Sequence, residues 1–174
     1  MVKGKSQYKF PKNIATMTVH HLYGMSDVGQ QKSVVDYLSQ NQGFALAADL
    51  IAQGFKPEDV AEAVNSGDVA YAHWPAEEPK TDLFYLKDEK TIKSLDDLAD
   101  KVVKLCGGGE DQPIGGDFAS AGAEMGNQQI AIVALIYARE KEKLKEIPKL
   151  DRGAGPMYVV KGSFSDKMLS ALLK

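Results

Sequence analysis

The longest uninterrupted apolar run of the chain, Ile130 to Ala138, constrains the fold more than any other feature. Every residue in it is apolar or aromatic, and charge returns abruptly at Arg139. A helix that is apolar on all sides is buried all round, whereas a surface helix carries a single apolar stripe. The run is also far shorter than the roughly 18 residues that a membrane span needs. We therefore expect a central core helix over 126–147, with its charged second half emerging into water, and no association with a membrane.

Composition favours an ordinary globular protein. The 174 residues are 44% hydrophobic and 26% charged, which is typical of a chain that buries a substantial core. We expect a basic N-terminal arm over 1–12 and a single globular domain over 13–174. Two sub-units of that domain, 13–106 and 117–174, would be joined by a glycine-rich loop at 107–116. One lone cysteine and the lack of a secretory signal pattern favour a cytoplasmic, intracellular location.

Charge is distributed unevenly along the chain. The net charge is −3, yet the first twelve residues contain no acid and four lysines: Lys3, Lys5, Lys9 and Lys12. Residues 56–100 are instead strongly acidic. We expect the lysines to lie on an exposed arm. This arm would contact a partner protein, or a nucleic acid without sequence specificity. Only two basic residues are arginines, which argues against specific base recognition, because that depends on the planar guanidinium group.

Periodicity, capping residues and helix breakers predict a mainly α-helical α+β fold of about six or seven helices with a small antiparallel sheet or hairpin. Besides the core helix, we expect helices from Ser26 or Asp27 to Gln42, Phe44 to Gln53, Pro57 to Asn65, Ser94 to Cys106, Phe118 to Met125 and Ser165 to Leu173. A hairpin is expected over 82–92 and a strand over Met157 to Lys161. Residues 14–22 fit a strand and a helix equally well.

The region 45–92 resembles a winged helix-turn-helix unit in the order of its elements. Two short helices meet at Gly54, a third segment runs from Gly67 to Trp74, and the hairpin would be the wing. A recognition helix needs basic residues to face phosphates. The candidate contains Asp68 and neither lysine nor arginine, so its charge favours helical packing or protein contact over DNA reading.

The residues that most often carry catalysis form no diagnostic pattern, so we predict no catalytic, cofactor-binding or metal-binding residue. His20 and His21 are adjacent, and neighbouring side chains diverge too far to chelate one metal easily. We expect His73 at a helix end. Cys106 falls at the C-terminal end of a helix, where the dipole disfavours a thiolate, and is expected to be structural. The loop from Gly107 to Gly116 lacks the spacing of a nucleotide-binding loop.

Three functions remain open at this stage. The first is a non-enzymatic structural or assembly protein, either a self-associating subunit or a small component of a larger complex, which uses its terminal extensions for contacts. The second is a nucleic-acid-binding protein that uses the 45–92 unit or the lysine arm. The third is a small intracellular enzyme whose active site is dispersed over His20, His21, His73 and carboxylates, since one sequence does not show which residues meet in space.

Overall fold

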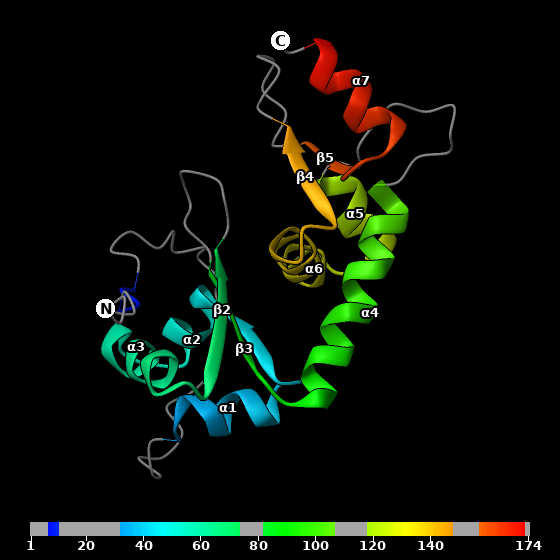
Figure 1. Cartoon of the computed structure of the whole chain (residues 1–174). Helices are drawn as coiled ribbons and strands as arrows, with labels where there is room; N and C mark the ends of the chain where they lie inside the picture. Colours follow the sequence, from blue (N-terminus) through cyan, green and yellow to red (C-terminus); the bar gives the residue numbers. More distant parts are fainter. Residues whose placement is uncertain (1–6, 11–31, 74–81, 107–117, 148–156, 173–174) are drawn as a thin grey trace, which may run out of the picture. The chain divides into compact units, whose positions relative to one another are not determined.

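The computed structural model describes residues 7–10, 32–73, 82–106, 118–147 and 157–172 (Figure 1). These ranges contain seven helices, one three-stranded and one two-stranded antiparallel sheet, so the predicted α+β class with its helical majority is confirmed. The chain divides into two compact units, Met1–Thr91 and Ile92–Lys174. None of the described helices combines the length and the apolar character that crossing a membrane requires.

The first unit is built around a three-stranded sheet with β3 in its centre, antiparallel to both β1 and β2. Its elements are α1 (Val34–Gln40), β1 (Phe44–Leu46), α2 (Ala47–Ala52), α3 (Pro57–Ser66), β2 (Val69–His73), β3 (Asp82–Leu86) and the first residues of α4 (Glu89–Cys106). Because side chains alternate between the two faces of a sheet, Ala45, Phe84 and Val69 lie on the same face. They share one buried cluster with Leu38 of α1 and Val60 of α3.

Part of the N-terminal segment belongs to this core, which the expected exposed arm did not include. Tyr8 is 7% exposed and lies in the same cluster as Phe84. Phe10 packs against that cluster, with its ring stacked on Phe84 at a centroid distance of 5.9 Å. Lys9, between them, is exposed. Residues 8–10 are therefore docked on the first unit, with Lys9 facing water.

Two segments predicted as helix in the first unit are strands. Phe44–Leu46 opens the expected helix 44–53 but pairs with β3, and α2 begins only at Ala47. The carboxylate of Asp49 accepts the N–H of Leu46 at 3.3 Å, which fixes the helix start at this later point. The candidate recognition segment after Gly67 is β2, which contradicts a helix-turn-helix unit over 45–92. It pairs with β3 along its whole length, from Val69 opposite Leu86 to His73 opposite Asp82.

The expected hairpin over 82–92 is also wrong. Only Asp82–Leu86 is extended, and it is the central strand of the sheet. The helix predicted from Ser94 starts earlier, at Glu89, because the carboxylate of Asp88 accepts the backbone N–H of Thr91 at 2.9 Å and its hydroxyl at 2.8 Å. An N-terminal cap of this kind satisfies N–H groups that the helix itself leaves unpaired. Ser94 lies inside α4.

Helix ends that carry glycine were predicted correctly, unlike several starts. Gly54 has φ +87° and Gly67 has φ +94°, the left-handed conformation expected at these C-termini. Pro57 occupies the first turn of α3, as predicted. The first helix, however, is capped by Ser33 and not by Ser26 or Asp27, since the Ser33 hydroxyl accepts the N–H of Asp36 at 3.1 Å.

Asp49 gives the first unit a pH dependence. Burial raises the pKa of this carboxyl, and its hydrogen bond from Leu46 opposes the shift only in part. The folded state then binds the proton more tightly than the unfolded chain, so stability falls as the pH rises through the native pKa. Asp49→Asn keeps an oxygen acceptor for Leu46. We expect the melting temperature of this variant minus that of the original chain to be higher at pH 7 than at pH 4. Paired thermal melts at both pH values measure this, and a constant difference would contradict it.

The second unit contains the remainder of α4, the helices α5 (Phe118–Met125), α6 (Gln128–Glu140) and α7 (Phe164–Leu172), and the antiparallel strands β4 (Leu144–Ile147) and β5 (Met157–Val160). The prediction of a core helix is confirmed over its apolar half, where Ala131 and every residue from Val133 to Ala138 are buried. The side-chain oxygen of Asn127 caps its start by accepting the N–H of Gln129 at 2.8 Å.

The charged half of the expected core helix is a turn followed by a strand. Glu142 has φ +56°, and the N–H of Lys143 donates to the carbonyl of Ala138 at 2.8 Å, which closes the helix with a left-handed turn. Leu144 is then buried in β4. Two further expectations need correction. The periodicity of the helix predicted from Ser94 places Leu95, Leu98, Val102, Val103 and Leu105 on its inner face, but Leu105 is 37% exposed. Ser163, not Ser165, caps α7. The strand over Met157–Val160 and the helix α5 are confirmed.

Candidate functional site

The most unusual polar group among the described residues is the carboxylate of Asp82, whose side chain is 3% exposed. Each of its oxygens receives one hydrogen bond. The hydroxyl of Tyr8 donates to Oδ2 at 2.6 Å, and Nδ1 of the His73 ring lies 2.8 Å from Oδ1. An ionised carboxylate only accepts hydrogen bonds, so this contact assigns the proton to Nδ1. The buried charge is thus held between a phenol and an imidazole.

Sheet register brings two of the three residues together. His73 ends β2 and is the register partner of Asp82, which begins β3. Tyr71, two residues before His73, points to the same face, and its ring lies 4.9 Å from His73 and 4.4 Å from Tyr8 between centroids. Tyr8 is far from both residues in the sequence. Its backbone N–H donates to Oδ1 of Asn65 in α3 at 3.0 Å.

Electrostatics keep the Tyr8 phenol in its donor form. Burial raises the pKa of Tyr8 strongly, and the hydrogen bond to the Asp82 carboxylate and that negative charge raise it further. Ionised Tyr8 would place a second negative charge beside Asp82 in a poorly solvated site. The phenol therefore stays protonated throughout the ordinary pH range and remains a permanent donor to Asp82.

The chemistry available to this cluster is hydrogen bonding and proton exchange. A buried carboxylate that orients one ring nitrogen of a histidine is an arrangement used to position imidazole bases and metal ligands. The His73 side chain is 59% exposed. Within the described ranges, however, no three His, Cys, Asp or Glu side chains are grouped so that they could hold a metal ion. What the contacts demonstrate directly is anchorage of the N-terminal segment on the sheet.

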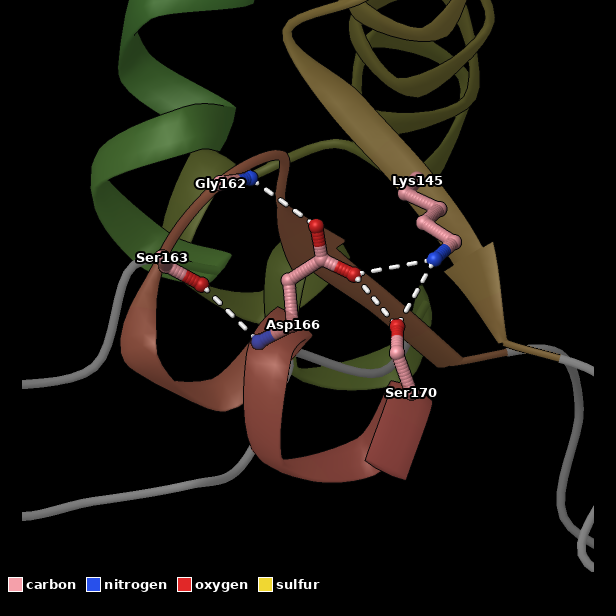
Figure 2. A network of polar contacts seen from close by, with 5 residues as sticks. All are labelled: Lys145, Gly162, Ser163, Asp166 and Ser170. Carbon is pink, nitrogen blue, oxygen red and sulfur yellow. Dashed lines mark hydrogen bonds and ion pairs between the residues drawn. The ribbon is translucent and has the colours of Figure 1, made fainter. Parts of the chain in front are cut away.

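A second polar cluster lies in the second unit, where the side chains of Lys145 and α7 meet (Figure 2). Lys145 Nζ donates to Ser170 Oγ at 2.9 Å and to Asp166 Oδ1 at 3.0 Å. A serine next to a lysine is a nucleophile–base combination in some enzymes, but the lysine must then be neutral. Here Lys145 forms a salt bridge with the carboxylate of Asp166. The pair therefore fastens α7 onto β4.

Asp166 is the centre of that second cluster. Its Oδ2 accepts the N–H of Gly162 at 2.9 Å, and its own N–H donates to Ser163 Oγ at 3.2 Å. The hydrogen bond from Gly162, followed by that from Lys145, lowers the pKa of the Asp166 carboxyl. These contacts make up the N-terminal cap of α7, so we assign a structural role to Figure 2's network.

Comparison with known proteins brings no assignment. No protein-family model, no curated protein and no solved structure matches the chain.

The sequence-predicted contact residues are placed only in part. Lys9 is exposed on the docked segment. Lys3, Lys5 and Lys12 lie outside the described residues, as do His20, His21 and the loop 107–116. Cys106 is buried at the end of α4. His73 lies at a strand end, where a helix end was predicted.

Sequence reasoning missed the Tyr8–Asp82–His73 cluster because its members lie far apart along the chain. One signal was present. Both strand sequences, VAYAH and DLFYL, are apolar or aromatic except for one polar residue at an end, His73 in the first and Asp82 in the second. Reading both segments as paired strands would have placed His73 opposite Asp82, but Tyr8 has no comparable local signal.

Proposed function

We propose that the chain is a non-enzymatic assembly protein that self-associates or joins a larger complex through its basic N-terminal segment. The observation that carries the proposal is the docking of residues 8–10 of this segment. Tyr8 is buried and Phe10 packs on the core, so Lys9 is held on the surface of the first unit. A contact residue that is already fixed loses less conformational freedom when a partner binds. The proposal includes the expected cytoplasmic location.

The partner that fits this segment is an acidic protein surface. Residues 1–12 carry four lysines and no acid, and residues 56–100 of the same chain carry an excess of carboxylates. Many of these are exposed in the described part of the chain, including Glu58, Glu62 and Asp68. A basic segment of one copy and an acidic surface of another are complementary in charge, which favours head-to-tail association of identical chains.

Neutralising the four lysines tests the proposal more cleanly than deleting the segment. Removal of residues 1–12 would also remove Tyr8 and damage the core. We expect Lys→Gln substitution at positions 3, 5, 9 and 12 to lower the mass of the assembly, measured by light scattering during size-exclusion chromatography at low salt. Substitution of four exposed lysines of the second unit should leave the mass unchanged: Lys101, Lys104, Lys141 and Lys167.

Two outcomes would redirect the proposal. A monomer at every concentration and salt level would refute self-association. Raised absorbance at 260 nm across the peak, lost in the lysine variant and steeply dependent on salt, would instead support non-specific nucleic-acid binding by the same segment. That function is the second candidate, because the exposed position of Lys9 suits phosphate contact as well as carboxylate contact.

A further inference from the structure

We propose that copies of this chain associate by exchanging residues 8–10, the docked segment, so that Tyr8 of one copy occupies the site on the first unit of another. Exchange of this kind rests on the self-association proposed above and names the contact that carries it. The site receives the same segment in the single chain and in the assembly, and only the copy that supplies the segment differs.

The docked segment is held by contacts with side chains. The Tyr8 hydroxyl donates to Asp82 at 2.6 Å, and the Tyr8 N–H donates to the side chain of Asn65 at 3.0 Å. The Tyr8 ring lies 4.4 Å from that of Tyr71 and 5.8 Å from that of Phe84 between centroids. The segment belongs to none of the described strands, so its release breaks no strand pairing. An identical segment can therefore replace it without any change in the sheet.

The site and the segment are complementary in charge. Asn65, which accepts the Tyr8 N–H, lies in α3, and the exposed Glu62 lies about one turn before it on the same helix. The sequence of α3 contains three carboxylates and no lysine or arginine. Lys9 is exposed on the docked segment, and the first twelve residues of the chain contain no acid. This complementarity favours the N-terminal segment of a second copy as the occupant of the site.

The chain is long enough for the exchange. Residues 11–31 separate the docked segment from Lys32, where the described chain resumes. A stretch of that length has a maximum extended length of about 70 Å. A folded unit of roughly 90 residues has a radius of gyration of only about 12 Å. The segment can thus reach its own site or that of an adjacent copy, and the protein concentration decides between the two.

Exchange predicts a specific form of competition. In a single chain the segment occupies its own site, so neither is available to another copy. An undocked segment on one copy and an empty site on another have no such competitor. Two chains with complementary defects should therefore form this contact more readily than chains in which the segment stays docked on its own site.

Cross-linking of two full-length chains measures this competition. The donor chain carries Asp82→Ala, which removes the acceptor of the Tyr8 hydroxyl and weakens docking of the segment within the donor. The acceptor chain carries Tyr8→Ala, which leaves its own site unfilled. The donor then supplies an intact segment and the acceptor supplies an intact site.

Two exposed positions report the contact between chains. Gln7→Cys in the donor lies next to Tyr8, and Ser66→Cys in the acceptor lies next to Asn65, which accepts the Tyr8 N–H. Cys106→Ala in both chains removes the only other thiol. A short bismaleimide links the two chains where the segment of the donor occupies the site of the acceptor, and the product is separated on a denaturing gel.

The matched control is a donor with Asp100→Ala in place of Asp82→Ala. Asp100 is exposed on α4, so this donor keeps its segment docked on its own site. We expect the Asp82→Ala donor to cross-link to the acceptor on the order of 10- to 100-fold faster than the control donor, the effect of losing one hydrogen bond to a charged group. Circular dichroism establishes that each chain is folded. The milder pair Asp82→Asn and Tyr8→Phe replaces any variant that is not.

Equal cross-linking rates with the two donors would overturn the exchange, as would a cross-link that persists when the donor also carries Tyr8→Ala. Self-association seen by light scattering without this cross-link would likewise overturn the exchange while leaving the assembly proposal in place. The mass of the original chain tests the assembly, and the cross-linking rates test the contact, so the failure of one is distinguishable from the failure of the other.

Discussion

Replacing Gly43 by alanine is expected to destabilise the first unit by about 2 to 5 kcal/mol. Gly43 has φ +87°, a conformation that costs an L-residue roughly 1 to 2 kcal/mol. A Cβ atom at this position would also lie 2.8 Å from both Cβ and Cγ2 of Thr91 and closer still to its hydroxyl. Thr91 is 3% exposed and is fixed by the Asp88 carboxylate, so it has little room to move.

Gly54→Ala is the matched control for that substitution. Gly54 has the same φ of +87°, but a Cβ atom there would meet no atom within 4 Å. Gly54→Ala should therefore lower the free energy of unfolding only by the cost of the left-handed backbone conformation, about 1 to 2 kcal/mol. Urea unfolding of both variants, followed by circular dichroism, measures the difference. Equal losses would show that Thr91 yields to the added methyl group and that steric exclusion at Gly43 contributes nothing.

Leu95→Ala is expected to cost about 2 to 5 kcal/mol of the free energy of unfolding, because this side chain is fully buried and its removal leaves a cavity. Leu105→Ala, the same change on the same helix, should cost less than about 1 kcal/mol, since Leu105 is 37% exposed. Leucine and alanine have similar helix propensities, so propensity contributes little to the contrast.

The two leucine variants are best compared by chemical denaturation, with one shared value for the slope of the unfolding free energy against denaturant concentration. Both residues were placed on the inner face of α4 from sequence periodicity, so the pair also measures what the structure adds to that pattern. Similar losses in the two variants would contradict the prediction that burial decides the cost.

The parts of the fold that could be predicted from sequence are those with a local physical signal. The apolar run of α6 has no polar face, so burial all round follows from composition alone. Gly54 and Gly67 mark helix ends because glycine adopts left-handed φ without strain. The end of α6 has the same left-handed geometry at Glu142, and the end of α1 has it at Gln42. Neither glutamate nor glutamine is typical of a left-handed turn. For this reason the predicted core helix continued beyond Glu142.

The strands β1 and β2 were harder to predict because they are short and have buried residues on both faces. Phe44, Leu46 and Leu83 are buried on the face opposite Phe84 and Ala45. A short run without polar alternation is indistinguishable from a piece of buried helix by periodicity. Their identity is decided by pairing across the sheet, which no single segment encodes. The His73–Asp82 contact depends on the same pairing, and Tyr8 reaches Asp82 from a segment outside the strands.

The position of α4 has a practical consequence for dividing the protein. The border between the units follows Thr91, inside a continuous helix that starts at Glu89. A cut at this border would strip the Asp88 cap from the second fragment and leave its first N–H groups without acceptors. It would also leave Thr91, the neighbour of Gly43, at a frayed end of the first fragment. Two autonomous halves must therefore overlap, with residues 88–106 encoded in both.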